Sequence, residues 1–199
     1  GYAVLQVNYR GSTGYGKAYV DALRGQWGIA DVEDAVSGAR HLADNDWVDA
    51  EKLVIMGGSA GGYTVLQTLV HHPGVFKAGI CLYGISNLFT LAATTHKFEA
   101  HYLDSLIGPL PEAAADYRAR SPIFAADHIR DPLAVFQGED DQVVPKAQAD
   151  AIVTSLRSRS VPHEYHVYAG EGHGWRKAET VAQFYTAVDA FLRQHVLFA

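Results

Sequence analysis

The sequence predicts an α/β protein in which a mostly parallel sheet is flanked by helices. Short apolar runs that suit buried strands alternate with longer segments whose apolar residues recur every three or four positions, the spacing of one helix face. The 199 residues, 48% of them hydrophobic, favour one globular core. We therefore expect a single domain over residues 1–199.

The predicted elements follow one another along the whole chain. The strands are expected at residues 3–9, 53–56, 78–83, 132–137 and 164–168. The helices are expected at residues 30–44, 61–70, 145–159 and 181–192. Residues 86–129 show only short helical pieces, and so long a stretch between strands is typical of a rim or lid.

The chain opens inside an apolar run. Gly1 leads directly into residues 3–9, and neither an initiator Met nor a signal peptide stands before them. A domain rarely begins in the middle of a sheet. We therefore expect the chain to be a fragment from which N-terminal strands of the fold are missing.

The composition limits the kinds of partner that this protein is expected to bind. The net charge of −6 is spread along the chain without a Lys/Arg cluster, so we expect no nucleic-acid partner. The sequence has no run of about 18 apolar residues, so we expect no membrane span. Cys81 is the only cysteine, which excludes an internal disulfide. We expect it to be a small buried hydrophobic residue, and the lack of disulfides fits a cytoplasmic location. We expect no metal and no cofactor.

The first chemical motif is Gly57-Gly58-Ser59-Ala60-Gly61, which matches G-x-S-x-G between a predicted strand and a predicted helix. That context is typical of a nucleophile elbow, a strained turn that exposes the Ser59 hydroxyl. Gly57 and Gly61 are expected because a side chain would collide with the neighbouring strand and helix. The alternative is an ordinary glycine-rich turn or phosphate cradle, although no GxxxxGK[ST] pattern follows.

A serine hydroxyl needs a base within hydrogen-bond reach, and in this arrangement an acid and then a histidine follow the serine along the chain. His173, flanked by glycines in the loop after the strand at 164–168, is the candidate base. The loop after residues 132–137 offers three consecutive acids, Glu139, Asp140 and Asp141. Spacing alone does not choose among them.

Several motifs together resemble one family. The chain is similar to the catalytic domain of the prolyl oligopeptidase family, most of all its acylaminoacyl-peptidase and dipeptidyl-aminopeptidase branch, along nearly all of its length. The matching segments are residues 8–16 (NYRGSTGYG), Trp27-Gly28 with Asp31 and Asp34, residues 57–62 (GGSAGG), Ser121-Pro122, residues 138–148 (GEDDQVVPKAQ) and residues 170–174 (GEGHG).

The resemblance implies an α/β-hydrolase fold and a complete triad. The family's G-x-x-D-x-x-V-P register selects Asp141 as the acid that orients His173, with Ser59 as nucleophile. Gln137 replaces a histidine that is common in the family, a departure for which we expect no catalytic consequence. The backbone N–H of Ala60, directly after the nucleophile, is the expected first oxyanion donor. A second donor is expected before Gly1.

The implied function is that of a serine peptidase that cleaves short peptides through an acyl-enzyme, with an N-terminal β-propeller of the same protein covering the site. Tyr83 and residues 86–102 are expected to line the specificity pocket. One alternative is a carboxylesterase, lipase or dienelactone-hydrolase-like enzyme of the same fold. Another is a non-catalytic, hydrolase-like binding module. Oligomeric state is not predicted.

Overall fold

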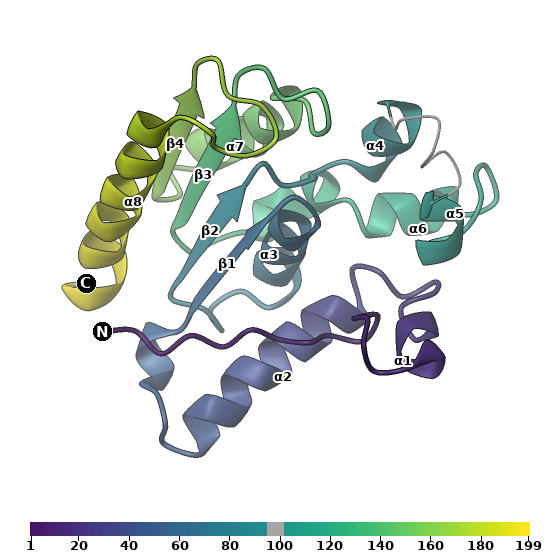
Figure 1. Cartoon of the computed structure of the whole chain (residues 1–199), viewed down its shortest axis with the longest axis horizontal. Helices are drawn as coiled ribbons and strands as arrows, with labels where there is room; N and C mark the ends of the chain where they lie inside the picture. Colours follow the sequence, from purple (N-terminus) through teal and green to yellow (C-terminus); the bar gives the residue numbers. More distant parts are fainter. Residues whose placement is uncertain (95–101) are drawn as a thin grey trace. The chain divides into compact units, whose positions relative to one another are not determined.

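The computed structural model of the chain describes residues 1–94 and 102–199, and Figure 1 shows its elements. The elements are α1 (Lys17–Asp21), α2 (Ala30–Asp44), η1 (Ala50–Lys52), β1 (Val54–Gly58), α3 (Ala60–His71), β2 (Ala78–Leu82), α4 (Leu88–Thr94), α5 (Tyr102–Leu106), α6 (Ala114–Ala119), η3 (Pro122–His128), β3 (Leu133–Gly138), α7 (Ala147–Ser158), β4 (His163–Tyr168), α8 (Ala178–Leu192) and η4 (Arg193–Leu197). They form two compact units, one of residues 1–50 and 88–120 and the other of residues 51–87 and 121–199.

The sheet belongs to the second unit. Its four described strands lie in the order β1-β2-β3-β4, and every pairing is parallel (Figure 1). The register aligns Gly57, Cys81, Val135 and Tyr165 in one row across the strands. Because all strands run the same way, the loops that follow them leave from one edge of the sheet, the edge where α/β proteins place their ligands.

One face of this sheet packs against α8. Alternate residues of a strand point to opposite faces, and Ala78, Ile80 and Leu82 of β2 share a buried cluster with side chains of α8. The rest of that cluster is Ala134, Phe136, Tyr168, Phe184, Phe191 and Val196.

The opposite face packs against α3. Position 79 of β2 carries no side chain, and a Cβ atom on Gly79 would stand 2.7 Å from the Leu69 Cδ1 atom of α3. Cys81, the next residue on this face, is buried and donates its thiol to the Gly62 carbonyl at 3.6 Å. Helices therefore cover both faces, which explains why β2 is apolar at every position.

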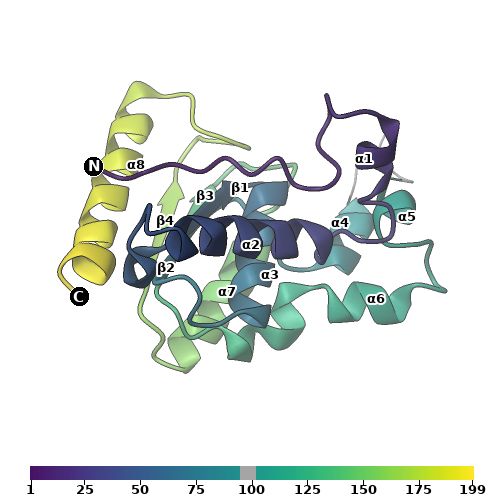
Figure 2. The same cartoon turned by 90° about the horizontal axis from the view of Figure 1, so that it is seen from below.

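The prediction of a strand over residues 3–9 is wrong. The segment is largely exposed, and Figures 1 and 2 draw it as a plain trace beside α2. Leu5 and Val7 approach that helix, with atoms 3.1 and 3.3 Å from where a Cβ on Gly38 would stand. A strand exists only through hydrogen bonds to a neighbour. Nothing among residues 1–94 and 102–199 forms a ladder with this segment.

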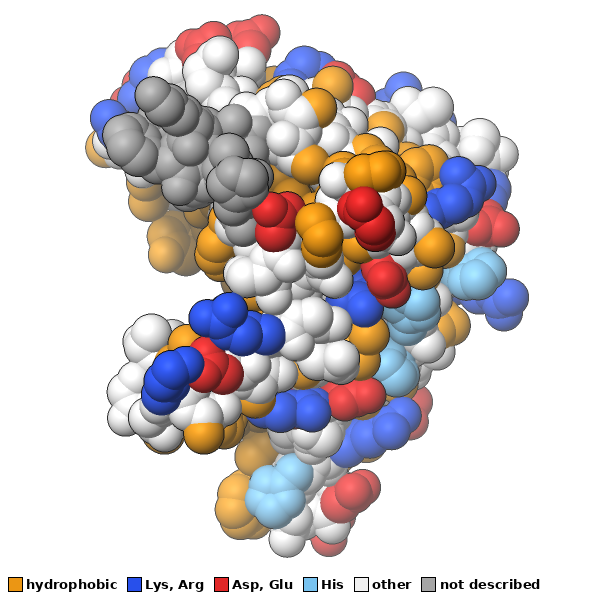
Figure 3. Space-filling model, turned by 90° about the vertical axis from the view of Figure 1, so that its right-hand side faces the viewer, with side chains coloured by type: hydrophobic (Ala, Val, Ile, Leu, Met, Phe, Trp, Pro, Cys, Tyr) orange, Lys and Arg blue, Asp and Glu red, His pale blue; other side chains and the backbone are white. Residues whose placement is uncertain are grey.

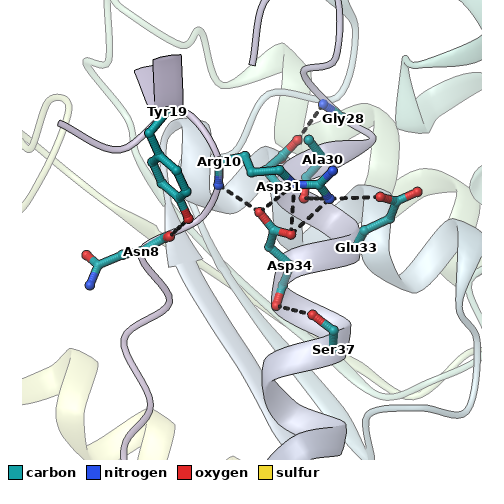
Figure 4. Close-up of polar contacts among 9 residues, drawn as sticks. All are labelled: Asn8, Arg10, Tyr19, Gly28, Ala30, Asp31, Glu33, Asp34 and Ser37. Carbon is teal, nitrogen blue, oxygen red and sulfur yellow. Dashed lines mark hydrogen bonds and ion pairs between the residues drawn. The ribbon is translucent and has the colours of Figure 1, made fainter. Parts of the chain in front are cut away.

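The loop after this segment is fastened to α2 by Arg10 (Figure 4). Its backbone N–H donates to the Asp34 carboxylate at 2.7 Å, and its guanidinium contacts Asp34 at 2.9 Å and Glu33 at 2.8 Å. Asp31, which is buried, accepts the N–H of Gly28 at 2.6 Å at the start of α2. Arg10, Asp31 and Asp34, which stand in the motifs that resemble the family, thus fix the backbone around the start of α2.

The other elements agree with the sequence to within a few residues. The helix predicted at 30–44 has those bounds, and the strands predicted at 53–56 and 132–137 become β1 and β3, shifted by one or two residues. Within residues 86–129 only short helices occur in the described part, and residues 95–101 lie outside it. Pro145, expected in the first turn of a helix, stands two residues before α7.

Surface charge and helix length are relevant to the expected absence of nucleic-acid and membrane partners. The described side chains on the face in Figure 3 include cationic and anionic groups interspersed with one another. No helix in the described ranges is both long and apolar enough to cross a membrane. The absence of nucleic-acid and membrane partners and the cytoplasmic location stay predictions.

Candidate active site

Ser59 occupies the sharp turn between β1 and α3. Its backbone has φ 55° and ψ −119°, a conformation that costs a non-glycine residue of the order of 1–3 kcal/mol and recurs at functional sites. The turn is held because the Ser59 N–H donates to the Leu82 carbonyl at 2.9 Å and its carbonyl accepts from Tyr63 at 2.9 Å. The side chain makes no capping bond to α3, which leaves the hydroxyl available to another partner.

The glycines of this turn have different roles. A Cβ on Gly57 would overlap the backbone of Gly61, so the expected collision is confirmed at Gly57. At Gly61 the expectation is wrong, because a Cβ there would meet nothing within 4 Å. The position without room for a side chain is Gly62, where a Cβ would stand 2.7 Å from the Cα of Gly84. Close approach of α3 to the end of β2 therefore selects Gly62 and Gly84.

Ser59, His173 and Asp141 form one continuous chain of hydrogen bonds. The His173 Nε2 atom lies 2.8 Å from the Ser59 Oγ atom, and its Nδ1 atom lies 2.8 Å from the Asp141 Oδ2 atom. The three residues follow β1, β4 and β3 respectively. The sheet edge therefore brings together residues that are up to 114 positions apart in the sequence.

The structure distinguishes the three acids of the loop after β3. Asp141 is buried, whereas Glu139 and Asp140 are exposed. The Asp141 Oδ1 atom accepts the N–H groups of Val143 and Val144, each at 2.9 Å. The carboxylate is therefore held by its own loop as well as by His173. The G-x-x-D-x-x-V-P register, which selected Asp141, agrees with this placement.

Gln137, at the end of β3, also touches Asp141. Its Nε2 atom donates to the Asp141 Oδ2 atom at 3.2 Å and to the Val144 carbonyl at 3.0 Å. The side chain is fully buried. Gln137 thus contributes to orienting the acid, and the expectation that this replacement has no catalytic consequence stays a prediction.

The electrostatic state of Asp141 suits a carboxylate that pairs with an imidazolium. Burial by itself raises the pKa of Asp141, but the hydrogen bonds from His173 and the Val144 N–H, with the charge of His173 and the Val143 N–H, outweigh it. The net effect lowers the pKa of Asp141 below its ordinary value. The residue is therefore ionised throughout the neutral range.

The loop that carries His173 is anchored by Glu171. Its Oε1 and Oε2 atoms accept the N–H groups of Lys177 and Arg176 at 2.9 and 3.0 Å, ahead of α8. These bonds lower the pKa of Glu171 despite the opposing effect of burial. The Glu171 carbonyl also accepts the N–H of Asp140 at 2.9 Å, which ties the histidine loop to the acid loop.

Two other predicted site residues have clear positions. Ala60 is the first residue of α3, so its N–H has no partner inside the helix and can face an oxyanion beside Ser59. Tyr83 directly follows β2 and lies half-buried beside His173, with ring centroids 4.6 Å apart. Its role in a specificity pocket stays a prediction, as does that of residues 86–102, of which 95–101 lie outside the described residues.

Sequence reasoning missed Gln137, Glu171, Gly62 and Gly84 as contributors to the site. Gly62 and Glu171 stood inside the quoted motifs, so their spacing from Ser59 and His173 was an available signal. The contact of Gly84 with Gly62 depends on how α3 packs against the end of β2, which no local pattern reveals, whereas Gln137 contacts residues of the loop that follows it. Among residues 1–94 and 102–199, no group of His, Cys, Asp and Glu side chains could hold a metal ion.

A parallel sheet flanked by helices, with a serine on a strained turn after one strand and an acid and a histidine on loops after later strands, defines an α/β-hydrolase fold. The model of the prolyl oligopeptidase family matches residues 1–197. The chain belongs to that family, which confirms both the resemblance and the predicted fold class.

Three relatives illustrate the similarity. Dipeptidyl aminopeptidase BIII of Pseudoxanthomonas mexicana is 34% identical over 98% of this chain and 29% of its own length. The human acylamino-acid-releasing enzyme is 28% identical over 98% of this chain and 28% of its own length. A puromycin-hydrolyzing peptidase of Mycobacterium tuberculosis is 45% identical in its solved structure, with a TM-score of 0.93 over 96% of this chain and 29% of that one. The chain thus spans less than a third of the length of these relatives.

Proposed function

We propose that this chain carries the catalytic residues of a serine peptidase that hydrolyses short peptides through an acyl-enzyme. The observation that carries the proposal is the unbroken hydrogen-bond chain from Asp141 through His173 to Ser59 on the strained turn. Membership of the prolyl oligopeptidase family supports it, because the named relatives include a dipeptidyl aminopeptidase and an acylamino-acid-releasing enzyme.

The proposed reaction starts at the Ser59 hydroxyl. As its oxygen attacks the carbonyl carbon of the substrate, the proton passes to the His173 Nε2 atom 2.8 Å away. Asp141 holds the Nδ1 proton on the other side of the ring and stabilises the imidazolium that forms. His173 then gives its proton to the departing amine, and water repeats the sequence to release the acyl group.

Negative charge on the carbonyl oxygen is proposed to be met by the Ala60 N–H. This group lies at the N-terminus of α3, a helix of 12 residues, where the helix dipole adds a positive potential. One such donor contributes about 10²–10³ in rate. The resemblance also implies a second oxyanion donor and a β-propeller, and we propose that the complete protein has both. We propose that the complete protein admits only short peptides.

The choice between peptidase and esterase is testable because the two reactions differ in the leaving group. An amine must be protonated to leave, whereas 4-nitrophenolate leaves without help. We expect the purified protein to hydrolyse aminoacyl- and dipeptidyl-4-nitroanilides, and Ser59→Ala to abolish this turnover. Hydrolysis of 4-nitrophenyl esters alone would favour the esterase alternative. No turnover of either class would favour a binding module.

Puromycin is a useful further substrate. The solved structure with 45% identity is that of a puromycin-hydrolyzing peptidase. In puromycin an amide joins an aminoacyl group to an aminonucleoside. We propose that this protein cleaves the same bond, with the aminonucleoside as leaving amine. Release of free aminonucleoside, measured by chromatography, tests this. Intact puromycin alongside rapid nitroanilide hydrolysis would restrict the proposal to peptides.

A further inference from the structure

We infer that Tyr83 is a positioning residue of this site, whose aromatic ring holds His173 in place and stabilises its positively charged form. The inference rests on the proposed function, because the imidazolium forms when His173 takes the Ser59 proton. It assigns to Tyr83 a role in the turnover step, beyond the pocket role expected from the sequence.

The Tyr83 ring contacts two residues of the histidine loop at once. Its centroid lies 4.6 Å from that of His173, with the planes tilted by 58°, and 5.3 Å from that of Trp175, in an edge-on arrangement at 78°. Edge-on and tilted pairs at these distances are favourable arrangements for aromatic rings. Tyr83 thus joins the end of β2 to the loop after β4 by contacts on both sides of Gly174.

That loop needs such a contact. His173 stands between Gly172 and Gly174, and Gly174 has φ 115°, so neither neighbour supplies a side chain that could hold the imidazole. The Glu171 carboxylate fixes the start of the loop through Arg176 and Lys177 but does not reach the ring. A rigid ring packed against His173 therefore restricts a residue whose own backbone is permissive.

Tyr83 is itself held firmly. Its backbone has φ 38°, which is uncommon for a bulky residue, and its N–H donates to the Phe136 carbonyl at 2.7 Å. Its ring atoms lie 3.0–3.1 Å from where a Cβ on Gly58 would stand, so position 58 leaves the ring the space it occupies beside the nucleophile turn. Burial, and then the charge of Asp141, raise the pKa of Tyr83, so the phenol stays neutral.

The same contact acts on charge. His173 faces Asp141 and Ser59 through its two nitrogens and the neutral Tyr83 ring from β2, while Trp175 on its own loop carries no titratable group. A cation over the face of an aromatic ring and within about 6 Å of its centroid is stabilised by about 0.5–1 kcal/mol at an exposed site. That corresponds to a two- to fivefold effect on the step in which the imidazolium forms.

The experiment compares Tyr83→Phe, Tyr83→Leu and a protein with 3,4,5-trifluorophenylalanine at position 83. The fluorinated ring keeps nearly the shape of Phe but loses the electron density that attracts a cation. The readouts are kcat and KM for a dipeptidyl-4-nitroanilide and the NMR titration midpoint of the His173 imidazole. The NMR readout does not depend on turnover, so failure of the proposed function and failure of this inference are distinguishable.

We expect Tyr83→Phe to keep kcat, and Tyr83→Leu to lower it two- to fivefold or more with little change in KM. The fluorinated ring keeps the packing and loses only the effect on charge, so it should lower kcat two- to fivefold relative to Phe, and its His173 midpoint should fall by about 0.4–0.7 pH unit relative to Phe. Equal kcat and midpoint for the fluorinated and Phe proteins would overturn the inference, even where Tyr83→Leu does not fold. A rise in KM alone would overturn it in favour of a substrate contact.

Discussion

Gly138 and Gly172 lie backbone against backbone, so that a Cβ atom on Gly138 would overlap the carbonyl oxygen of Gly172. Gly138 ends β3 and opens the loop that carries Asp141, whereas Gly172 directly precedes His173. The spacing of acid and base in the candidate triad therefore depends on the absence of a side chain at position 138.

Gly138→Ala should push these two loops apart. We expect unfolding free energy to fall by about 1–3 kcal/mol, because the colliding atoms are backbone, and kcat to fall by about 10²-fold as His173 moves away from Asp141. Urea unfolding and steady-state kinetics measure both. Gly172→Ala is the matched control, since a Cβ there would meet only the Asp140 carbonyl, at 4.0 Å. Equal behaviour of the two variants would contradict this description of the loops.

A second matched pair tests the nucleophile turn. In Gly57→Ala the new Cβ would overlap the Gly61 backbone, so we expect a loss of about 1–3 kcal/mol in unfolding free energy and of most activity. In Gly61→Ala the Cβ enters open space in the first turn of α3, where alanine favours the helix, so stability should be kept or slightly raised. A Gly61→Ala protein as damaged as Gly57→Ala would show that the turn is built differently.

The sequence signals found all four strands of the described sheet but also predicted a strand at residues 3–9 that the structure does not have. Residues 53–56, 78–83, 132–137 and 164–168 are apolar or alternating runs whose strand neighbours lie within the described residues, and each forms a strand. Residues 3–9 have the same local pattern and no ladder partner there. A local pattern records a preference for extended backbone, whereas a strand also requires a neighbour.

The site shows the same limit at the level of single residues. Ser59 and His173 could be chosen from local context, because a glycine-flanked serine or histidine after a strand is a distinctive pattern. The choice among three adjacent acids needed the family's register, and burial in the structure agrees with Asp141. The side chains of Gln137 and Glu171 bond to groups four to seven positions further along the chain, and these pairings depend on the conformation of each loop, which one sequence does not show.

Asp141 should make stability depend on pH in the acid range. Its pKa is lower in the folded chain than the value of about 3.9 expected for the unfolded chain, so the unfolded state binds more protons as pH falls. Its contribution is complete above about pH 5 and is lost as pH falls through 3.9 towards the folded pKa. Asp141→Asn should therefore flatten unfolding free energy between pH 5 and 3. The exposed neighbour Asp140→Asn should keep the original slope, and a steep slope in both variants would contradict this assignment.

Glu171→Gln should act on turnover through the loop. The carboxylate uses one oxygen for the Arg176 N–H and the other for the Lys177 N–H, whereas an amide offers a single acceptor oxygen. We expect a lower kcat with little change in KM, because the start of the histidine loop loosens while the substrate contacts remain. The matched control is Glu139→Gln, an exposed acid on the neighbouring loop. An unchanged kcat in Glu171→Gln would show that the anchor is dispensable.

Ser59 is proposed to be a nucleophile that His173 activates. Reaction with a fluorophosphonate, followed by mass spectrometry of the peptides, tests it directly, because only an activated serine attacks such a reagent at an appreciable rate. The predicted result is one phosphonyl adduct on Ser59, lost in Ser59→Ala and strongly slowed in His173→Ala. Labelling of another serine, or labelling that persists in Ser59→Ala, would contradict the account.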